Sequence, residues 1–284
     1  MKHGNINNSL KEINFNNKSY FLKNFNQTDS FYRKKREMAF YAYSKKMGIG
    51  NVPNFFIKNN FLFIEKVYPN KKHINIEDYI NYLLEFVKNL NLKYQDYAFY
   101  AKENLVQKSI FARVKDRISL IDEDKSVFTR KHYYKMLDHL NNFKFKAGNQ
   151  IIINPSDVGL HNFLYTDKGP YFIDFEYSGK DKLIKFILDL VLHPANGIKS
   201  KDYIFFINKI YHSLTSDNQF INGSYISIFA LWWSTRLECS ISSKNIEKKI
   251  KLGLLSKKDK IKYINNRSKL IKNYENISKR YSFN

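Results

Sequence analysis

Residues 151–177, IIINPSDVGLHNFLYTDKGPYFIDFEY, break a series of helical patterns with short apolar runs set around polar turns. The first run, Ile151–Ile153, is β-branched and predicts a strand. It leads into a loop in which Asn162 follows Asp157 in the pattern D-x-x-x-x-N. Taken alone, such a pair in an Asn-rich chain is more typical of a turn than of a catalytic site. The residues downstream favour the catalytic interpretation.

A hairpin is predicted directly after this loop. Asp167-Lys168-Gly169 favours a tight turn, and the apolar run Tyr171–Ile173 forms the returning strand. Asp174 stands at the end of that strand, twelve residues after Asn162. We therefore expect the hairpin to bring Asn162 and Asp174 to one metal ion.

The N-terminal quarter of the chain predicts two hairpins separated by a helix. The hairpins cover residues 10–25, with a turn at Asn16-Asn17, and residues 55–67, with a turn at Asn59-Asn60. The helix covers residues 28–47, and Gly48 and Gly50 stop it.

After Pro69 the periodicity becomes helical. The expected helices lie near residues 76–92, 96–121 and 129–142 and from about 181 onward, with a Lys-rich helix over the last forty residues. We therefore expect an α+β fold, with a small antiparallel β lobe plus one helix at residues 1–67 and a larger, mainly helical C-terminal lobe at residues 68–284.

Composition limits the class of protein. The chain has 284 residues, of which 43% are hydrophobic, as in globular proteins with one large core or two smaller ones. The single cysteine, Cys239, excludes an internal disulfide and a cysteine-based zinc site. The N-terminus lacks the apolar core of a signal peptide, and Lys185 and Asp189 interrupt the most apolar later run. We expect no membrane span and a cytoplasmic location.

The formal charge of +22 raises the question of a polyanionic partner. Lysine greatly outnumbers arginine, and Asn, Ile, Phe and Tyr are also abundant. All these residues have codons rich in A and T, so biased base composition explains much of the charge. No arginine cluster or nucleic-acid-binding motif accompanies it. Anionic small molecules are therefore favoured over nucleic acids as ligands.

The polar residues of segment 151–177 suit phosphoryl transfer. That reaction needs a group that orients the acceptor hydroxyl, ligands for a metal ion and a cation for the nucleotide phosphates. Asp157 is the candidate for the first role, and Asn162 and Asp174 are the candidate metal ligands. Lys23, in the predicted strand YFLK, is the candidate cation.

The strand, the D-x-x-x-x-N loop, the hairpin and IDFEYSG at residues 173–179 together resemble the aminoglycoside phosphotransferase and choline kinase superfamily. The resemblance implies a protein kinase-like two-lobe fold, ATP and Mg²⁺ as cofactors, and an alcohol group as acceptor. The family loop usually begins His-Gly-Asp, whereas this chain has Pro155-Ser156-Asp157. Because that histidine chiefly braces the loop, we expect altered loop support and retained chemistry.

The resemblance also implies roles for residues near the N-terminus. Glu37, in the predicted helix, is expected to pair with Lys23 and hold its amine near the nucleotide phosphates. Residues 4–9 occupy the place of the phosphate-covering loop, which makes Asn8 and Ser9 candidate nucleotide contacts. A frayed terminus is the alternative.

Residues 64–67 occupy the place of the link between lobes. Glu65 and Val67 are candidate contacts of adenine there, with an ordinary connector as the alternative.

Four other residues permit a functional or a structural interpretation. His161 either assists the acceptor or supports the loop, and Asp189 either anchors the metal loop or faces solvent. Trp232 and Trp233 either line a substrate cleft or pack in the core.

The acceptor is predicted to be a small neutral or anionic molecule. Polycationic aminoglycosides need an acidic cleft, yet residues 185–284 contain seven acidic and eighteen basic residues. A sugar or sugar-like alcohol is favoured, while choline and ethanolamine stay open because an aromatic-rich chain can supply a cation–π site. Two alternatives to a kinase are a catalytically silent nucleotide-binding module of the same fold and a basic nucleic-acid-binding protein.

Overall fold

The computed structural model describes residues 9–24, 30–59, 61–70, 74–92, 110–121, 130–141, 150–155, 157–216, 221 and 223–282. The chain forms two compact units. The first comprises Met1–Lys102, Asn149–Ile198 and Ile210–Ser216, and the second comprises Glu103–Gly148, Lys199–Lys209 and Asp217–Asn284. The predicted lobe boundary between residues 67 and 68 lies inside the first unit, and the division into lobes at that point stays a prediction.

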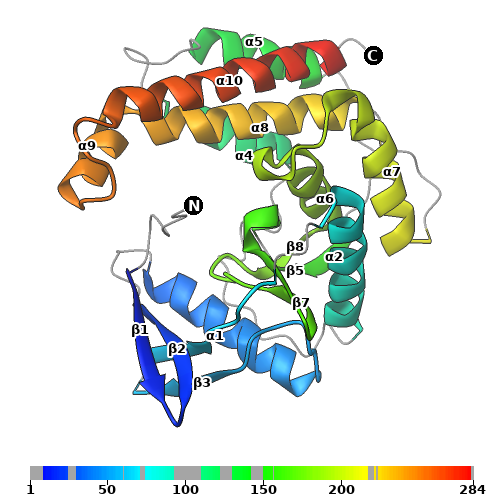
Figure 1. Cartoon of the computed structure of the whole chain (residues 1–284). Helices are drawn as coiled ribbons and strands as arrows, with labels where there is room; N and C mark the ends of the chain where they lie inside the picture. The colour runs from blue at the N-terminus through cyan, green and yellow to red at the C-terminus, as the bar shows by residue number, and fades with distance from the viewer. Residues whose placement is uncertain are drawn as a thin grey trace. The chain divides into compact units, whose positions relative to one another are not determined.

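The first unit begins with a four-stranded antiparallel sheet of strand order β1-β2-β4-β3 (Figure 1). Its strands are β1 (Ser9–Phe15), β2 (Lys18–Asn24), β3 (Phe55–Lys58) and β4 (Phe61–Glu65), and helix α1 (Ser30–Lys46) lies between β2 and β3 in the chain. Asn16 and Asn17 both have positive φ, at 49° and 60°, which is the backbone of a tight hairpin turn. Both predicted hairpins and the helix between them are confirmed.

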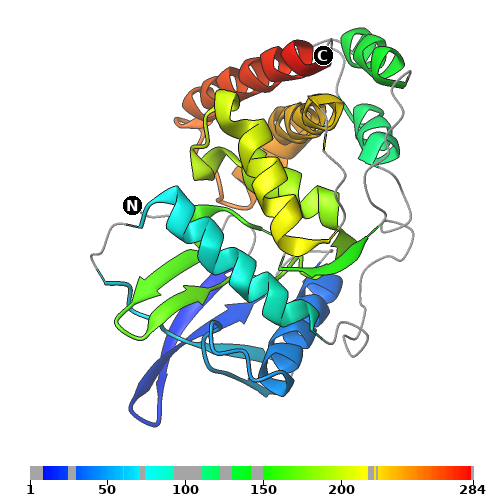
Figure 2. The same cartoon turned by 90° about the vertical axis from the view of Figure 1, so that its right-hand side faces the viewer.

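The remaining strands of this unit form two separate pairs. Strands β5 and β8 pair with each other, and β6 and β7 form the hairpin predicted from Asp167-Lys168-Gly169. The elements here are α2 (Ile76–Asn91), β5 (Ile151–Asn154), the 3₁₀ turn η3 (Leu160–Asn162), β6 (Phe163–Thr166), β7 (Gly169–Phe172), β8 (Gly179–Lys182), α6 (Leu183–Leu192) and the 3₁₀ turn η4 (Pro194–Asn196). Helix α2 lies beside the β6–β7 hairpin (Figure 2).

Aromatic rings form the core that joins these elements. The rings of Phe86 in α2 and Phe172 in β7 stack with centroids 4.5 Å apart. Phe40 of α1 stacks on Phe175 at 4.1 Å. All four side chains are at most 5% exposed. The core thus connects α1 and α2 to the chain on either side of Asp174.

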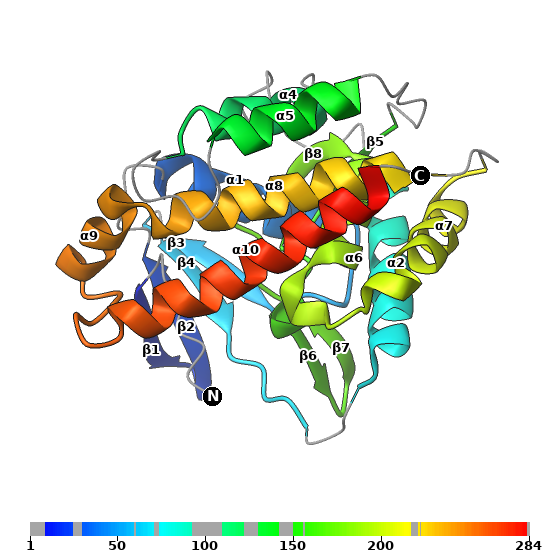
Figure 3. The ribbon, with the colours of Figure 1, turned by 90° about the horizontal axis from the view of Figure 1, so that it is seen from above.

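The second unit is helical. It contains α4 (Ile110–Ile118), α5 (Arg130–Asn141), the 3₁₀ turn η5 (Ser200–Asp202), α8 (Gly223–Ile241), α9 (Ser243–Lys251) and α10 (Lys260–Ser282), while α7 (Tyr203–Leu214) runs from this unit into the first. Helices α8 and α10 run side by side (Figure 3). No helix of the described residues has both the length and the hydrophobicity of a membrane span.

Two sequence-based helix predictions need correction or restriction. The last forty residues form two helices rather than one, because the chain turns at Gly253, which has a φ of +68°. Helix α10 packs against its neighbours, since it buries Ile271 and Tyr274 among other side chains. Of the helix predicted over residues 96–121, the part before residue 110 lies outside the described residues.

Two buried carboxyl groups lie in the second unit. Glu238 of α8 and Glu275 of α10 are each 2% exposed. Burial and the nearby Glu238 carboxylate raise the pKa of Glu275 to about 8. Glu275 is therefore protonated in the folded protein at neutral pH.

This proton makes the stability of the protein depend on pH. Because the folded-state pKa of Glu275 lies above the ordinary value of 4.5, its stabilising contribution is complete below pH 4.5 and is lost as pH rises through 8. We expect the melting temperature of the wild-type protein to fall by a few degrees more than that of Glu275→Gln between pH 6 and 9. Circular dichroism measures the melting temperature of both proteins at each pH. An equal fall in melting temperature for the wild type and Glu275→Gln would contradict the assignment of a protonated Glu275.

Candidate active site

Lys23 is the centre of a buried group of charges in the first unit. It projects from β2 with a side chain that is 2% exposed. Its Nζ lies 2.7 Å from Glu37 Oε2, 2.7 Å from Asp174 Oδ1 and 3.8 Å from Glu176 Oε2. Burial opposes the charge of Lys23, but these carboxylates outweigh it and raise the pKa of the amine. Lys23 is therefore a fixed, fully charged cation.

Glu37 connects this lysine to the segment that follows β7. Its Oε1 accepts a hydrogen bond of 3.3 Å from the backbone N–H of Phe175. The Glu37 side chain is fully buried, and burial, opposed by Lys23, raises the pKa of its carboxyl to about 7. The ion pair predicted between Lys23 and Glu37 is thus present, and the same carboxylate also holds the residue next to Asp174.

Phe175 gives this connection its apolar support. Its ring is 1% exposed and stacks on Phe40 of α1, next to the bond between its backbone and Glu37. Replacing Phe175 by alanine is expected to lower the free energy of unfolding by about 3–5 kcal/mol, because it leaves a cavity in the core. Denaturant unfolding measures this loss. A loss below about 1 kcal/mol would show that the ring is not a core residue.

Asp174 has an uncommon backbone. Its φ is +66°, in the left-handed region, which is uncommon for residues other than glycine, although asparagine and aspartate adopt it more readily than most. Such a conformation costs free energy and is often found where a side chain has to point in one direction for function. Here the carboxylate points at Lys23. The sequence predicted a strand end at this place but not the turn of the backbone.

Asn162 lies next to this segment and to the catalytic loop. The backbone N–H of Ile173 donates to the Asn162 carbonyl at 3.0 Å, which places Asp174 one residue beyond the pairing. The amide nitrogen of Asn162 donates to the Asp157 carbonyl at 3.1 Å, so its amide oxygen is the atom available to a cation. Asn162 is 7% exposed. The structure therefore brings the predicted residues 157, 162 and 174 into one neighbourhood.

The donor set and charge at this place fit a magnesium ion. The carboxyl groups of Glu37, Asp174 and Glu176 lie at most 3.8 Å from the amine of Lys23, and Glu176 also lies 3.9 Å from Arg33. Mg²⁺ prefers carboxylate and amide oxygens as ligands. Asp174 and Asn162 supply one of each.

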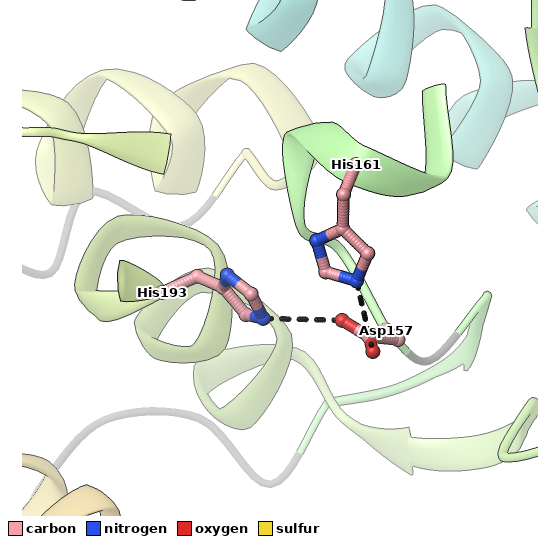
Figure 4. A group of neighbouring side chains, drawn as sticks. All are labelled: Asp157, His161 and His193. Carbon is pink, nitrogen blue, oxygen red and sulfur yellow. Dashed lines mark ion pairs between the residues drawn. The ribbon is translucent and has the colours of Figure 1, made fainter. Parts of the chain in front are cut away.

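Asp157 lies between two imidazole rings (Figure 4). Its Oδ1 is 3.1 Å from His193 Nε2, and its Oδ2 is 3.5 Å from His161 Nε2. Burial alone would raise the pKa of Asp157, but the hydrogen bonds from His161 and His193 outweigh burial and lower it below its usual value. The hydrogen bond with Asp157 in turn raises the pKa of His161. Asp157 is thus a permanent carboxylate and a hydrogen-bond acceptor.

The loop is held by residues that the sequence patterns did not single out. The Asn196 side chain accepts from the Leu160 N–H at 2.7 Å and donates to the Val158 carbonyl at 3.0 Å. The hydroxyl of Tyr79, in α2, donates to the same carbonyl at 2.7 Å. These contacts and that of His193 support the loop, and the effect of Pro155 on this support stays a prediction. No local sequence signal marks His193 or Asn196, because they follow a helix about forty residues downstream.

A cavity of about 120 Å³ lies beside Lys23. One part of its lining is charged, from Lys23, Glu37 and Asp174. The other part consists mainly of apolar side chains, among them Phe21, Ile64, Val67, Leu164 and Ile173. The cavity thus combines an apolar wall with a lysine and carboxyl groups at one side.

The predicted linker residues Glu65 and Val67 both line this cavity. The Glu65 carboxylate itself is bound to Asn54 Nδ2 at 2.6 Å and Lys18 Nζ at 3.0 Å.

The other predicted residues lie elsewhere. Asn8 is outside the described residues, and Ser9 begins strand β1. Asp189 is 6% exposed and forms an ion pair of 2.5 Å with Lys185 of its own helix, so it does not face solvent.

The two tryptophans belong to the second unit. Trp233 is 4% exposed and stacks on Tyr274, while the guanidinium of Arg117 lies 4.4 Å above the ring of Trp232. Both rings are engaged in packing within that unit.

Comparison with known proteins rests on structure alone. No family model matches the sequence, and no curated protein is detectably similar to it. Among solved structures, choline kinase LicA from Streptococcus pneumoniae is similar with a TM-score of 0.58 and 15% identity, over 96% of this chain and 93% of that one. A putative aminoglycoside phosphotransferase from Ralstonia eutropha gives a TM-score of 0.60 and 13% identity, over 98% and 94%. The chain has the protein kinase-like fold of these phosphotransferases.

A third structure with this kinase-like fold is a spectinomycin phosphotransferase in complex with ADP and spectinomycin, with a TM-score of 0.59 and 11% identity over 95% of this chain and 90% of that one. The likeness covers nearly the whole chain in each comparison. It therefore confirms the α+β, kinase-like fold class predicted from residues 151–179.

Proposed function

We propose that the chain is an ATP-dependent small-molecule kinase that transfers the γ-phosphate of ATP to a hydroxyl group. The observation that carries this proposal is the position of Lys23, whose buried amine contacts both Glu37 and Asp174 at 2.7 Å. A buried lysine held by two carboxylates is costly to maintain for stability alone. It suits a site that has to receive phosphates and a divalent cation together.

The residues of the site divide the tasks of the reaction in this proposal. Lys23 binds the nucleotide phosphates, and Glu37 keeps its amine in place and fixes the backbone of Phe175. Asp174 and Asn162 hold Mg²⁺, which when bound supplies neutralisation of charge on the transferring phosphoryl group. The apolar cavity wall, with Val67 and the backbone of Glu65, receives the adenine.

Asp157 receives the acceptor hydroxyl. Its carboxylate accepts the hydrogen bond of that hydroxyl and directs the oxygen toward the phosphorus atom. In a loose phosphoryl-transfer transition state, orientation of the acceptor counts for more than early removal of its proton. A carboxylate whose pKa is lowered by two imidazoles is suited to orientation, since it is a weak base but a constant acceptor.

The proposed acceptor is a small neutral or anionic alcohol, with a sugar or sugar-like molecule favoured. Three of the seven acidic residues in 185–284, namely Asp189, Glu238 and Glu275, are buried. They therefore cannot contribute exposed negative charge to a site for a polycation.

A panel of acceptors tests this proposal. ADP production from MgATP is measured with sugars, sugar phosphates, choline, ethanolamine and an aminoglycoside at equal concentrations. We expect stimulation by a neutral or anionic alcohol. Stimulation by cations alone would contradict the acceptor class, and stabilisation by MgATP without turnover under any condition would favour the catalytically silent module. Salt-sensitive binding of DNA or RNA without any effect of nucleotide would favour the nucleic-acid-binding alternative.

A further inference from the structure

We propose that His193 is a positioning residue for Asp157, fixed in one tautomer by the turn that follows α6. This inference rests on the proposed kinase function, because Asp157 is the residue that His193 positions. Its structural part, the tautomer, is independent of activity.

The tautomer follows from the two hydrogen bonds of the ring. The backbone N–H of Ala195 donates to His193 Nδ1 at 3.2 Å, so Nδ1 has a lone pair and no proton. The proton of the neutral ring is then on Nε2, which lies 3.1 Å from Asp157 Oδ1. The His193 side chain is 10% exposed and the Asp157 side chain 27% exposed. The turn thus presents an N–H group to one oxygen of the catalytic carboxylate.

A bound transition metal is the other use that Asp157, His161 and His193 permit. Their ligand atoms all lie within 4.8 Å of one another, and two imidazoles with a carboxylate suit zinc. A metal on His193 Nε2 would place the ring proton on Nδ1, directly against the Ala195 N–H. The hydrogen bond at Nδ1 therefore favours positioning of Asp157 over metal binding.

The same turn supports the loop at two further points. Asn196, three residues after His193, binds the Val158 carbonyl and the Leu160 N–H. It also donates to the Leu190 carbonyl at 2.7 Å, which ties the turn to the end of α6. Residues 193–196 consequently hold both the side chain of Asp157 and the backbone after it.

Gly159 shows how closely the rings approach the loop. A Cβ atom at this position would lie 2.4 Å from His161 Cε1 and 2.6 Å from His193 Cε1. The backbone of Gly159 is extended, with φ −79° and ψ 143°, so alanine is compatible with its conformation. Space for the two imidazoles, rather than backbone freedom, is the reason for glycine here.

Three variants separate positioning from a merely structural role. His193→Leu removes the donor, His193→Gln retains an N–H near the position of Nε2, and Gly159→Ala displaces the rings while leaving both histidines present. Steady-state turnover of MgATP, KM for ATP and melting temperature are measured for each. His161→Leu is the matched comparison, because it removes the imidazole at the longer distance of 3.5 Å.

We expect His193→Leu and Gly159→Ala to lower kcat by about 10–100-fold with KM for ATP nearly unchanged, as for misplacement of a reacting group. His193→Gln is expected to restore most of the rate, and His161→Leu to cost less than His193→Leu. A wild-type rate in His193→Leu, or equal loss in the Leu and Gln variants, would overturn the proposal.

The ring nitrogens supply a test that needs no activity and no variant that might unfold. In protein labelled with ¹⁵N-histidine, two-dimensional spectra identify the tautomer of His193, and His193→Gln assigns its signals. We expect the Nε2–H tautomer near pH 7.5 without added metal. An Nδ1–H ring would overturn the inference and favour a metal at Nε2. Absence of turnover in the wild type alongside the Nε2–H tautomer would instead count against the proposed function.

Discussion

Replacing Asp174 by asparagine is expected to abolish the magnesium-dependent stabilisation of the protein by ATP. At a MgATP concentration about 100 times its Kd, binding adds about 2.7 kcal/mol to the free energy of unfolding, and this increment should disappear. The physical reason is the loss of the one carboxylate that contacts Lys23 and also belongs to the proposed metal ligands. Thermal unfolding with and without ATP and Mg²⁺ measures the effect.

Asparagine is the suitable replacement because it tolerates the left-handed backbone of residue 174, at φ +66°, whereas alanine would add strain. Asp167→Asn is the matched control, since Asp167 lies at the exposed turn of the same hairpin. Equal stabilisation of the Asp174→Asn variant and the control by MgATP would show that Asp174 is not a metal ligand.

Asp157→Asn has the second large expected effect, on rate rather than on binding. Turnover of MgATP should fall by about 10²–10⁴-fold, the range found when an acid–base or orienting group is removed. Stabilisation by MgATP should stay at the wild-type level, because Lys23, Glu37 and Asp174 are unchanged. Asparagine also keeps the size of the side chain between the two imidazoles.

The turnover rate and the stabilisation by MgATP are measured on the same preparation of Asp157→Asn, which distinguishes a role in the reaction from a role in nucleotide binding. If Asp157→Asn lost stabilisation by MgATP together with rate, Asp157 would belong to nucleotide binding. If it kept the wild-type rate, Asp157 would have no part in the reaction.

The features predicted correctly from sequence are those that local chemistry decides. Asn16-Asn17 adopts positive φ in a two-residue turn, and Gly48 ends α1 with a φ of +66°. The turn residues Asp167-Lys168-Gly169 and the apolar run Tyr171–Ile173 correctly predicted the β6–β7 hairpin. The contact of Lys23 with Glu37 was expected from the resemblance, and their order along the chain is compatible with it.

The features not predicted depend on contacts between distant segments. His193 and Asn196 reach the catalytic loop only because α6 ends beside it, and nothing in the residues around them indicates this. The positive φ of Asp174 results from the simultaneous demands of Lys23, Glu37 and the core ring Phe175 on one short segment. The separation of α9 from α10 arises in the turns of residues 252–259, which include Gly253 with its positive φ, inside a Lys-rich pattern that is helical on both sides.

Transfer of phosphate is the most direct measure of the central claim. ATP labelled at the γ-phosphate is incubated with the protein, Mg²⁺ and a pool of small metabolites, and labelled products are separated from ATP and inorganic phosphate. We predict a new labelled metabolite with the wild-type protein and the Asp167→Asn control, and none with Asp157→Asn. Absence of any labelled metabolite with wild-type protein that MgATP stabilises would contradict the proposed kinase activity.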